Sequence, residues 1–166
     1  MSFYKAPVFN LDTQEWSYRE FQTKGDTIRY VYSQFKYPGQ YGLKHATKVW
    51  DAPGRFFEAN GYYCKHPKNS IDFRKYWDFE KEKSYTHGFI IYVSEEEGYE
   101  QMLPSLYYWY LNFTPIYDKV KKSLTIPAIW DGDLHTYMAL LLCLLTGYLF
   151  VCLKKRQFGM SLKLTS

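Results

Sequence analysis

The stretch Tyr137–Leu153 reads YMALLLCLLTGYLFVCL and contains no charged residue, and the basic residues Lys154–Arg156 follow it directly. These seventeen residues would cover about 25 Å as a helix, slightly less than the ~30 Å core of a bilayer. Extending the helix back to Leu134, and forward along the aliphatic stems of the lysines, closes this difference. A buried helix of an ordinary domain is the alternative, but such a helix normally has a polar face. The stretch therefore predicts one membrane-spanning helix over residues 134–156.

Residues on both flanks of this stretch suit a membrane interface. Trp and Tyr are enriched at membrane interfaces, and cations flank the cytoplasmic side. The predicted interface residues are Trp130 and Tyr137 before the stretch or at its start, and Lys154, Lys155 and Arg156 after it. Gly147 lies inside the stretch, where the missing side chain favours close packing against another helix. The predicted organisation is an extramembrane region over residues 1–133, the transmembrane helix over 134–156 and a short basic tail over 157–166.

The net charge of +4 is concentrated behind the apolar stretch. The chain has 21 basic and 17 acidic residues, and the segment after Leu153 holds four of the basic residues and no acid. Residues 1–153 therefore carry no net charge, which removes the main support for a nucleic-acid-binding protein. Basic flanks prefer the cytoplasmic or matrix side of a membrane, so we expect the C-terminus on that side.

The first 133 residues show little regular patterning, although 21% of the chain is aromatic. We expect a membrane protein whose N-terminal region is mostly irregular, with short helices and few strands. The expected elements are extended segments over 1–11, 27–37 and 88–93 and helices over 13–24, 71–83, 94–103 and 106–113. The helix over 13–24 is predicted from Asp12 and Glu15, which have the spacing of a capping box.

The sequence LYYWYL is the most prominent feature outside the apolar stretch. It comprises Leu106, Tyr107, Tyr108, Trp109, Tyr110 and Leu111. Tyr and Trp bury a large apolar body and keep a polar group at its edge, so such a segment suits contact with a partner protein or with a membrane surface. A small hydrophobic core is the alternative, and the sequence leaves the three interpretations open.

Residues that could support catalysis are scattered. Cys64 and His66 supply two potential zinc ligands, but two further ligands at a useful spacing are missing. His135 lies at the predicted membrane boundary. The sequence shows no glycine-rich phosphate loop, no G-x-S-x-G motif and no C-x-x-C motif. We therefore predict no catalytic, cofactor-binding or metal-binding residue, no cofactor, and a chain that is not an enzyme.

In overall architecture the chain resembles the supernumerary subunits of mitochondrial respiratory-chain complexes, which are small, aromatic-rich and single-spanning. The resemblance implies a non-catalytic accessory subunit of a mitochondrial inner-membrane complex, in the respiratory chain or ATP synthase, with its C-terminus in the matrix. Its partners would be the other subunits and the lipid bilayer. Two alternatives stay open: a tail-anchored adaptor or receptor of the mitochondrial outer membrane, and a small membrane-bound metalloenzyme that uses Cys64, His66 and His135.

Overall fold

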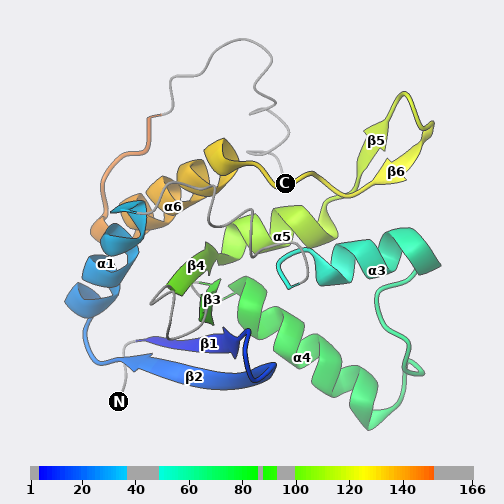
Figure 1. Cartoon of the computed structure of the whole chain (residues 1–166), viewed down its shortest axis with the longest axis horizontal. Coiled ribbons are helices and arrows are strands. Elements are labelled where there is room, and N and C mark those ends of the chain that lie inside the picture. The colour runs from blue at the N-terminus through cyan, green and yellow to red at the C-terminus, as the bar shows by residue number, and fades with distance from the viewer. Residues whose placement is uncertain (1–3, 37–48, 86–87, 93–99, 152–166) are drawn as a thin grey trace.

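The computed structural model describes residues 4–36, 49–85, 88–92 and 100–151, and Figure 1 shows their arrangement. The strands are β1 (Tyr4–Asn10), β2 (Glu15–Phe21), β3 (Gly88–Tyr92), β4 (Glu100–Pro104), β5 (Ile116–Asp118) and β6 (Ser123–Thr125). The helices are α1 (Lys24–Ser33), α3 (Ala52–Asn60), α4 (Ile71–Tyr85), α5 (Ser105–Phe113) and α6 (Asp131–Thr146), with a 3-10 turn, η1 (Gln34–Lys36), after α1. This is an α/β fold, so the expected irregular N-terminal region with a transmembrane helix is wrong.

The main sheet has the strand order β2-β1-β3-β4, and helices pack on both of its faces (Figure 1). Strand β1 pairs antiparallel with β2 and parallel with β3, while β4 pairs antiparallel with β3. Alternating side chains of β1 and β2 carry aromatic rings to opposite faces. On one face Phe21 contacts both Tyr4 and Tyr30 of α1. On the other face Trp16 contacts both Phe9 and Phe79 of α4.

The apolar stretch forms α6, which packs on the core of this domain. Leu134, Tyr137, Met138, Leu141 and Leu145 recur with helical spacing and are at most 6% exposed. They belong to the same hydrophobic core as β1, β3, β4 and α5. No helix in the described part of the chain combines the length and the apolar character that crossing a bilayer requires. The transmembrane prediction is therefore wrong, because the buried stripe of α6 is covered by protein.

Helix α6 also ends earlier than expected. It closes at Gly147, which adopts a left-handed conformation with φ of 79°, and the Gly147 N–H donates to the Cys143 carbonyl at 2.8 Å. Such a glycine commonly ends a helix, since residues with a side chain are strained in the left-handed conformation. The sixteen residues of α6 span about 24 Å. Residues 152–156 of the expected transmembrane helix, and the expected tail over 157–166, lie outside the described residues.

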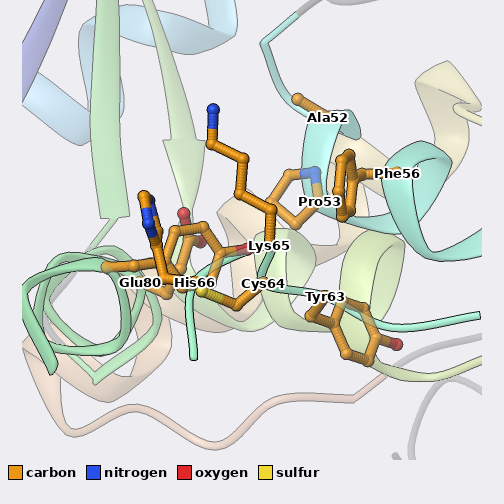
Figure 2. A pocket seen from close by; sticks show the side chains of 9 residues that line it. Ala52, Pro53, Phe56, Tyr63, Cys64, Lys65, His66 and Glu80 are labelled. Atoms are coloured by element: carbon orange, nitrogen blue, oxygen red, sulfur yellow. The ribbon is translucent and has the colours of Figure 1, made fainter. Parts of the chain in front are cut away.

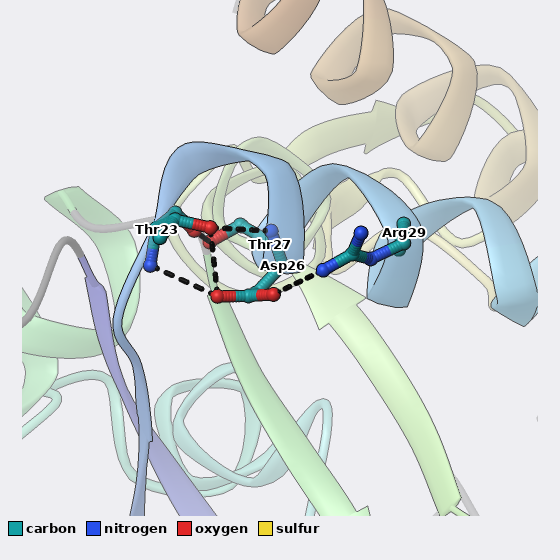
Figure 3. Close-up of polar contacts among 4 residues, drawn as sticks. All are labelled: Thr23, Asp26, Thr27 and Arg29. Carbon is teal, nitrogen blue, oxygen red and sulfur yellow. Dashed lines mark hydrogen bonds and ion pairs between the residues drawn. The ribbon is translucent and has the colours of Figure 1, made fainter.

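Two expectations near the N-terminus are exchanged in the structure. The helix expected over 13–24 is largely strand β2, because its residues pair with β1 in continuous register from Tyr4 with Phe21 to Asn10 with Glu15. The described part of the segment expected to be extended over 27–37 is helix α1 and η1. Helix α1 starts at a capping box in which Thr23 and Asp26 bond to one another's backbone N–H groups, as Figure 3 shows. This cap starts a helix in the segment that was expected to be extended.

Several other elements agree with the sequence. The helices expected over 71–83 and 106–113 are confirmed as α4 and α5, and the extended segment over 88–93 is confirmed as β3 through residue 92. The helix expected over 94–103 is wrong for Glu100–Leu103, which pair with β3 as part of β4; residues 94–99 lie outside the described residues. Helix α3 was not expected. Pro53 lies in its first turn, where proline is well tolerated.

Candidate functional site

The LYYWYL segment lies in α5 and contributes most of its rings to the core. Tyr107, Tyr108 and Leu111 are fully buried, and Tyr110 is nearly so. Trp109 is half-buried, and only Leu106 is exposed, at 44%. Of the three interpretations of this segment, packing in a hydrophobic core is the one that matches its position in the fold.

Of the residues expected at a membrane interface, the structure describes Trp130 and Tyr137, and both contact Tyr107. Trp130 precedes the first turn of α6 and is exposed, and its backbone N–H and carbonyl bond to the Tyr107 hydroxyl at 3.1 and 3.2 Å. Tyr137 is buried and stacks on Tyr107 with ring centroids 5.2 Å apart. Lys154, Lys155 and Arg156 lie outside the described residues. Within the described part of the chain, a Cβ atom on Gly147 would meet nothing within 4 Å, and packing of this glycine against a helix of another protein stays a prediction.

The possible zinc ligands are brought together only in part. Cys64 and His66 line one cavity, whereas His135 lies on α6 near Phe35. In the described residues no three side chains of the types that bind metals are grouped. Cys64 is a free, half-buried thiol. Because Cys64 and His66 line the same cavity, that cavity is the candidate site.

This cavity has a volume of about 340 Å³ and lies between α3, α4 and the connection that joins them. Its lining residues are Ala52, Pro53, Phe56, Tyr63, Cys64, Lys65, His66, Tyr76 and Glu80. Figure 2 shows Pro53 and Phe56 on one side, His66 and Glu80 on the opposite side, and Cys64 and Lys65 between them. A concave space with mainly apolar walls and a few converging polar groups is the usual form of a small-molecule site.

Aromatic contacts hold the connecting segment in place. The Tyr63 ring stacks on Phe57 of α3 at 4.5 Å and lies 5.0 Å from Phe113 of α5. Trp77 of α4 meets the same ring edge-on at 6.2 Å. Because Tyr63 is fixed by three helices, the following residues Cys64–His66 are positioned along the cavity wall.

Glu80, which lines the cavity, also belongs to a buried charge network. One Glu80 carboxylate oxygen pairs with the Lys83 ammonium at 2.8 Å, and the other accepts a hydrogen bond from the Tyr108 hydroxyl. Burial lowers the pKa of Lys83, with Glu80 opposing that shift. Burial raises the pKa of Tyr108, and the charge of Glu80 raises it further. The negative charge of Glu80 is therefore already compensated from within the core.

Sequence reasoning singled out Cys64 and His66 but missed Pro53, Phe56, Tyr76 and Glu80. Tyr76 and Glu80 are four residues apart in α4, a spacing that places them on one helix face. In the helix predicted over 71–83, this spacing indicates that the two side chains lie close together. Their meeting with α3 depends on the tertiary fold, in which α3 and α4 both pack on α5.

Comparisons with protein-family models, with curated proteins and with solved structures find no significant match to this chain.

Proposed function

We propose that this chain is a non-catalytic subunit of a multi-protein assembly and that it binds a neighbouring protein through the end of α6. The observation that carries the proposal is a run of exposed apolar side chains, here called the α6-end surface. It comprises Leu144, Tyr148, Leu149 and Val151, which are 64%, 77%, 86% and 69% exposed.

Exposed apolar side chains that gather within one short segment mark protein interaction sites. In the α6-end surface, four large side chains fall within eight residues, and burying each in a partner would contribute on the order of 1–2 kcal/mol. Leu144 lies on the side of α6 that does not pack in the core, and Tyr148, Leu149 and Val151 follow the end of the helix at Gly147.

The positive charge of the residues after Leu153 indicates the charge that a partner's surface would carry. Residues after Leu153 carry four basic side chains and no acid, whereas residues 1–153 are balanced. An apolar groove with an acidic rim on a folded protein complements both features, because the groove receives the apolar side chains and the rim attracts the cations. We propose such a protein as the partner.

The resemblance to accessory subunits supports the assembly role. That resemblance depended in part on a membrane-spanning helix, which α6 does not form. The proposal therefore keeps the non-catalytic role in an assembly and names no membrane and no organelle.

The test compares two full-length variants with the wild type. The double variant Leu149→Asp and Val151→Asp places charges in the α6-end surface, while Val120→Asp changes a side chain that is 92% exposed in the turn between β5 and β6. Proteins that co-purify with the wild type are identified, purified separately and titrated against each form. We expect the double variant to weaken direct binding by at least about tenfold, and Val120→Asp to leave it unchanged.

Three outcomes would contradict the proposal. Equal loss of binding in Val120→Asp would show that the α6-end surface is not specific. Light scattering that finds a dimer of this chain, abolished by the double variant, would assign the surface to self-association. Tight binding to vesicles of phosphatidylcholine and phosphatidylserine, with no protein captured, would assign it to lipid.

A further inference from the structure

We propose that the cavity between α3 and α4 binds a small aromatic anion, a planar ring that carries one carboxylate or phosphate group. The inference is independent of the α6-end surface. It follows from the shape of the cavity, from the charge that remains uncompensated at its edge and from the fixed position of its lining.

The walls suit a planar ring. Pro53 and Phe56 face His66 across the space in Figure 2, and Tyr63 and Tyr76 add further aromatic lining. Flat rings pack well against proline and aromatic faces, and ring pairs attract one another beyond the effect of the area they bury. The volume of about 340 Å³ falls in the range of small-ligand sites.

The charge selects an anion. Glu80 is compensated by Lys83 and by the Tyr108 hydroxyl, so this carboxylate is not free to attract a cation. Lys65 also lines the cavity and is exposed. None of the ion pairs formed among the described residues involves its ammonium. An acidic group on the ligand would accept charge-assisted hydrogen bonds from Lys65 while the ring stays between the walls.

The site is built before a ligand arrives. Tyr63 is fixed by Phe57, Trp77 and Phe113, and Glu80 is held from two sides. Preformed walls reduce the ordering cost of binding, which favours recognition of a small ligand.

The experiment titrates the full chain with four probes of similar size: phenylacetate, phenyl phosphate, benzyl alcohol and benzylamine. Binding is followed by nuclear magnetic resonance, with backbone amide shifts mapped on the fold. We expect saturable shifts at residues 63–66, 76 and 80, with at least one anion binding about tenfold more tightly than the alcohol and the amine. The comparison of phenylacetate with phenyl phosphate distinguishes carboxylate from phosphate ligands.

A matched pair of variants assigns the charge preference. Lys65→Met should reduce the affinity for the preferred anion about tenfold and leave benzyl alcohol unaffected. Lys68→Met changes an exposed lysine of the same connection that does not line the cavity, and should leave every affinity unchanged. Both positions are exposed, so both variants should fold.

Binding of the alcohol or the amine as tightly as the anions would overturn the proposal. So would an unchanged anion affinity in Lys65→Met, shifts that map away from the cavity, or no saturable shift by any probe at millimolar concentration.

Discussion

At the scale of single residues, Asn112 connects three segments of the core. Its side-chain amide donates to the carbonyls of Trp50 and Tyr108 at 2.6 and 2.9 Å, and its side-chain oxygen accepts from the Gly54 N–H at 2.9 Å. Asn112 is completely buried. Gly54 allows this approach, since a Cβ there would lie 2.8 Å from Ile126 and 3.0 Å from the Leu111 carbonyl. One amide thus fixes α3 on α5.

We expect Asn112→Leu to lower the free energy of unfolding by about 3 kcal/mol, because the Trp50 carbonyl and the Gly54 N–H would be buried without partners. Urea unfolding followed by circular dichroism measures the change. The control is Asn60→Ala, whose amide bonds the Phe56 carbonyl on the surface, and its effect should stay within about 0.5 kcal/mol. A similar cost for both variants would contradict the role of Asn112.

At the scale of elements, α6 shows why its amino-acid pattern was misinterpreted. From Tyr137 to Leu145 the helix has no charged residue on any side, so its buried and exposed faces do not differ in charge there. Leu141 is 6% exposed and Leu144 is 64% exposed, although both are leucines in one uncharged run. A hydropathy pattern cannot separate a lipid-covered helix from one that packs on a core and offers its second face to a partner.

Two leucine substitutions test this arrangement of α6. Leu141→Ala should lower the free energy of unfolding by about 3 kcal/mol, because it removes side-chain volume from the core. Leu144→Ala should change it by less than about 0.5 kcal/mol, because that side chain is exposed. Urea unfolding of the purified chain gives both values. Equal effects would show that the two faces of α6 are not distinguished as described.

At the scale of the whole molecule, buried tyrosines make stability depend on alkaline pH. Burial raises the pKa of Tyr30, Tyr107 and Tyr108 above the ordinary value of 10.0. The charge of Glu100 adds to this shift at Tyr30, and that of Glu80 adds to it at Tyr108. The folded chain therefore keeps these protons at a pH where the unfolded chain releases them. Their contribution is complete below about pH 10 and is lost as the pH rises further.

We expect the free energy of unfolding to fall above about pH 10.5 by about 1.4 kcal/mol per pH unit for each such tyrosine. Burial lowers the pKa of the Lys83 ammonium below its ordinary value of 10.5. Lys83 therefore makes the free energy of unfolding rise with pH until about pH 10.5, so the slope due to the tyrosines is measured above that pH. Urea midpoints at successive pH values give the slope. Tyr30→Phe should reduce the slope by the share of one tyrosine, and an unchanged slope would contradict the assignment.

The sequence by itself determined some of the local elements, although it missed the capping box of Thr23 and Asp26 that starts α1. Helices α4 and α5 and strand β3 were predicted, and the residues Cys64 and His66 of the cavity were noticed. Tertiary structure decided what distant segments do to one another. Pairing with β1 made Glu15–Phe21 a strand, and contact with the core gave the apolar stretch of α6 its buried face. The cavity likewise exists only because α3 and α4 both pack on α5. The physical reason is that hydrophobic burial and strand pairing depend on neighbours in space, whereas capping and turn signals depend on neighbours in the chain.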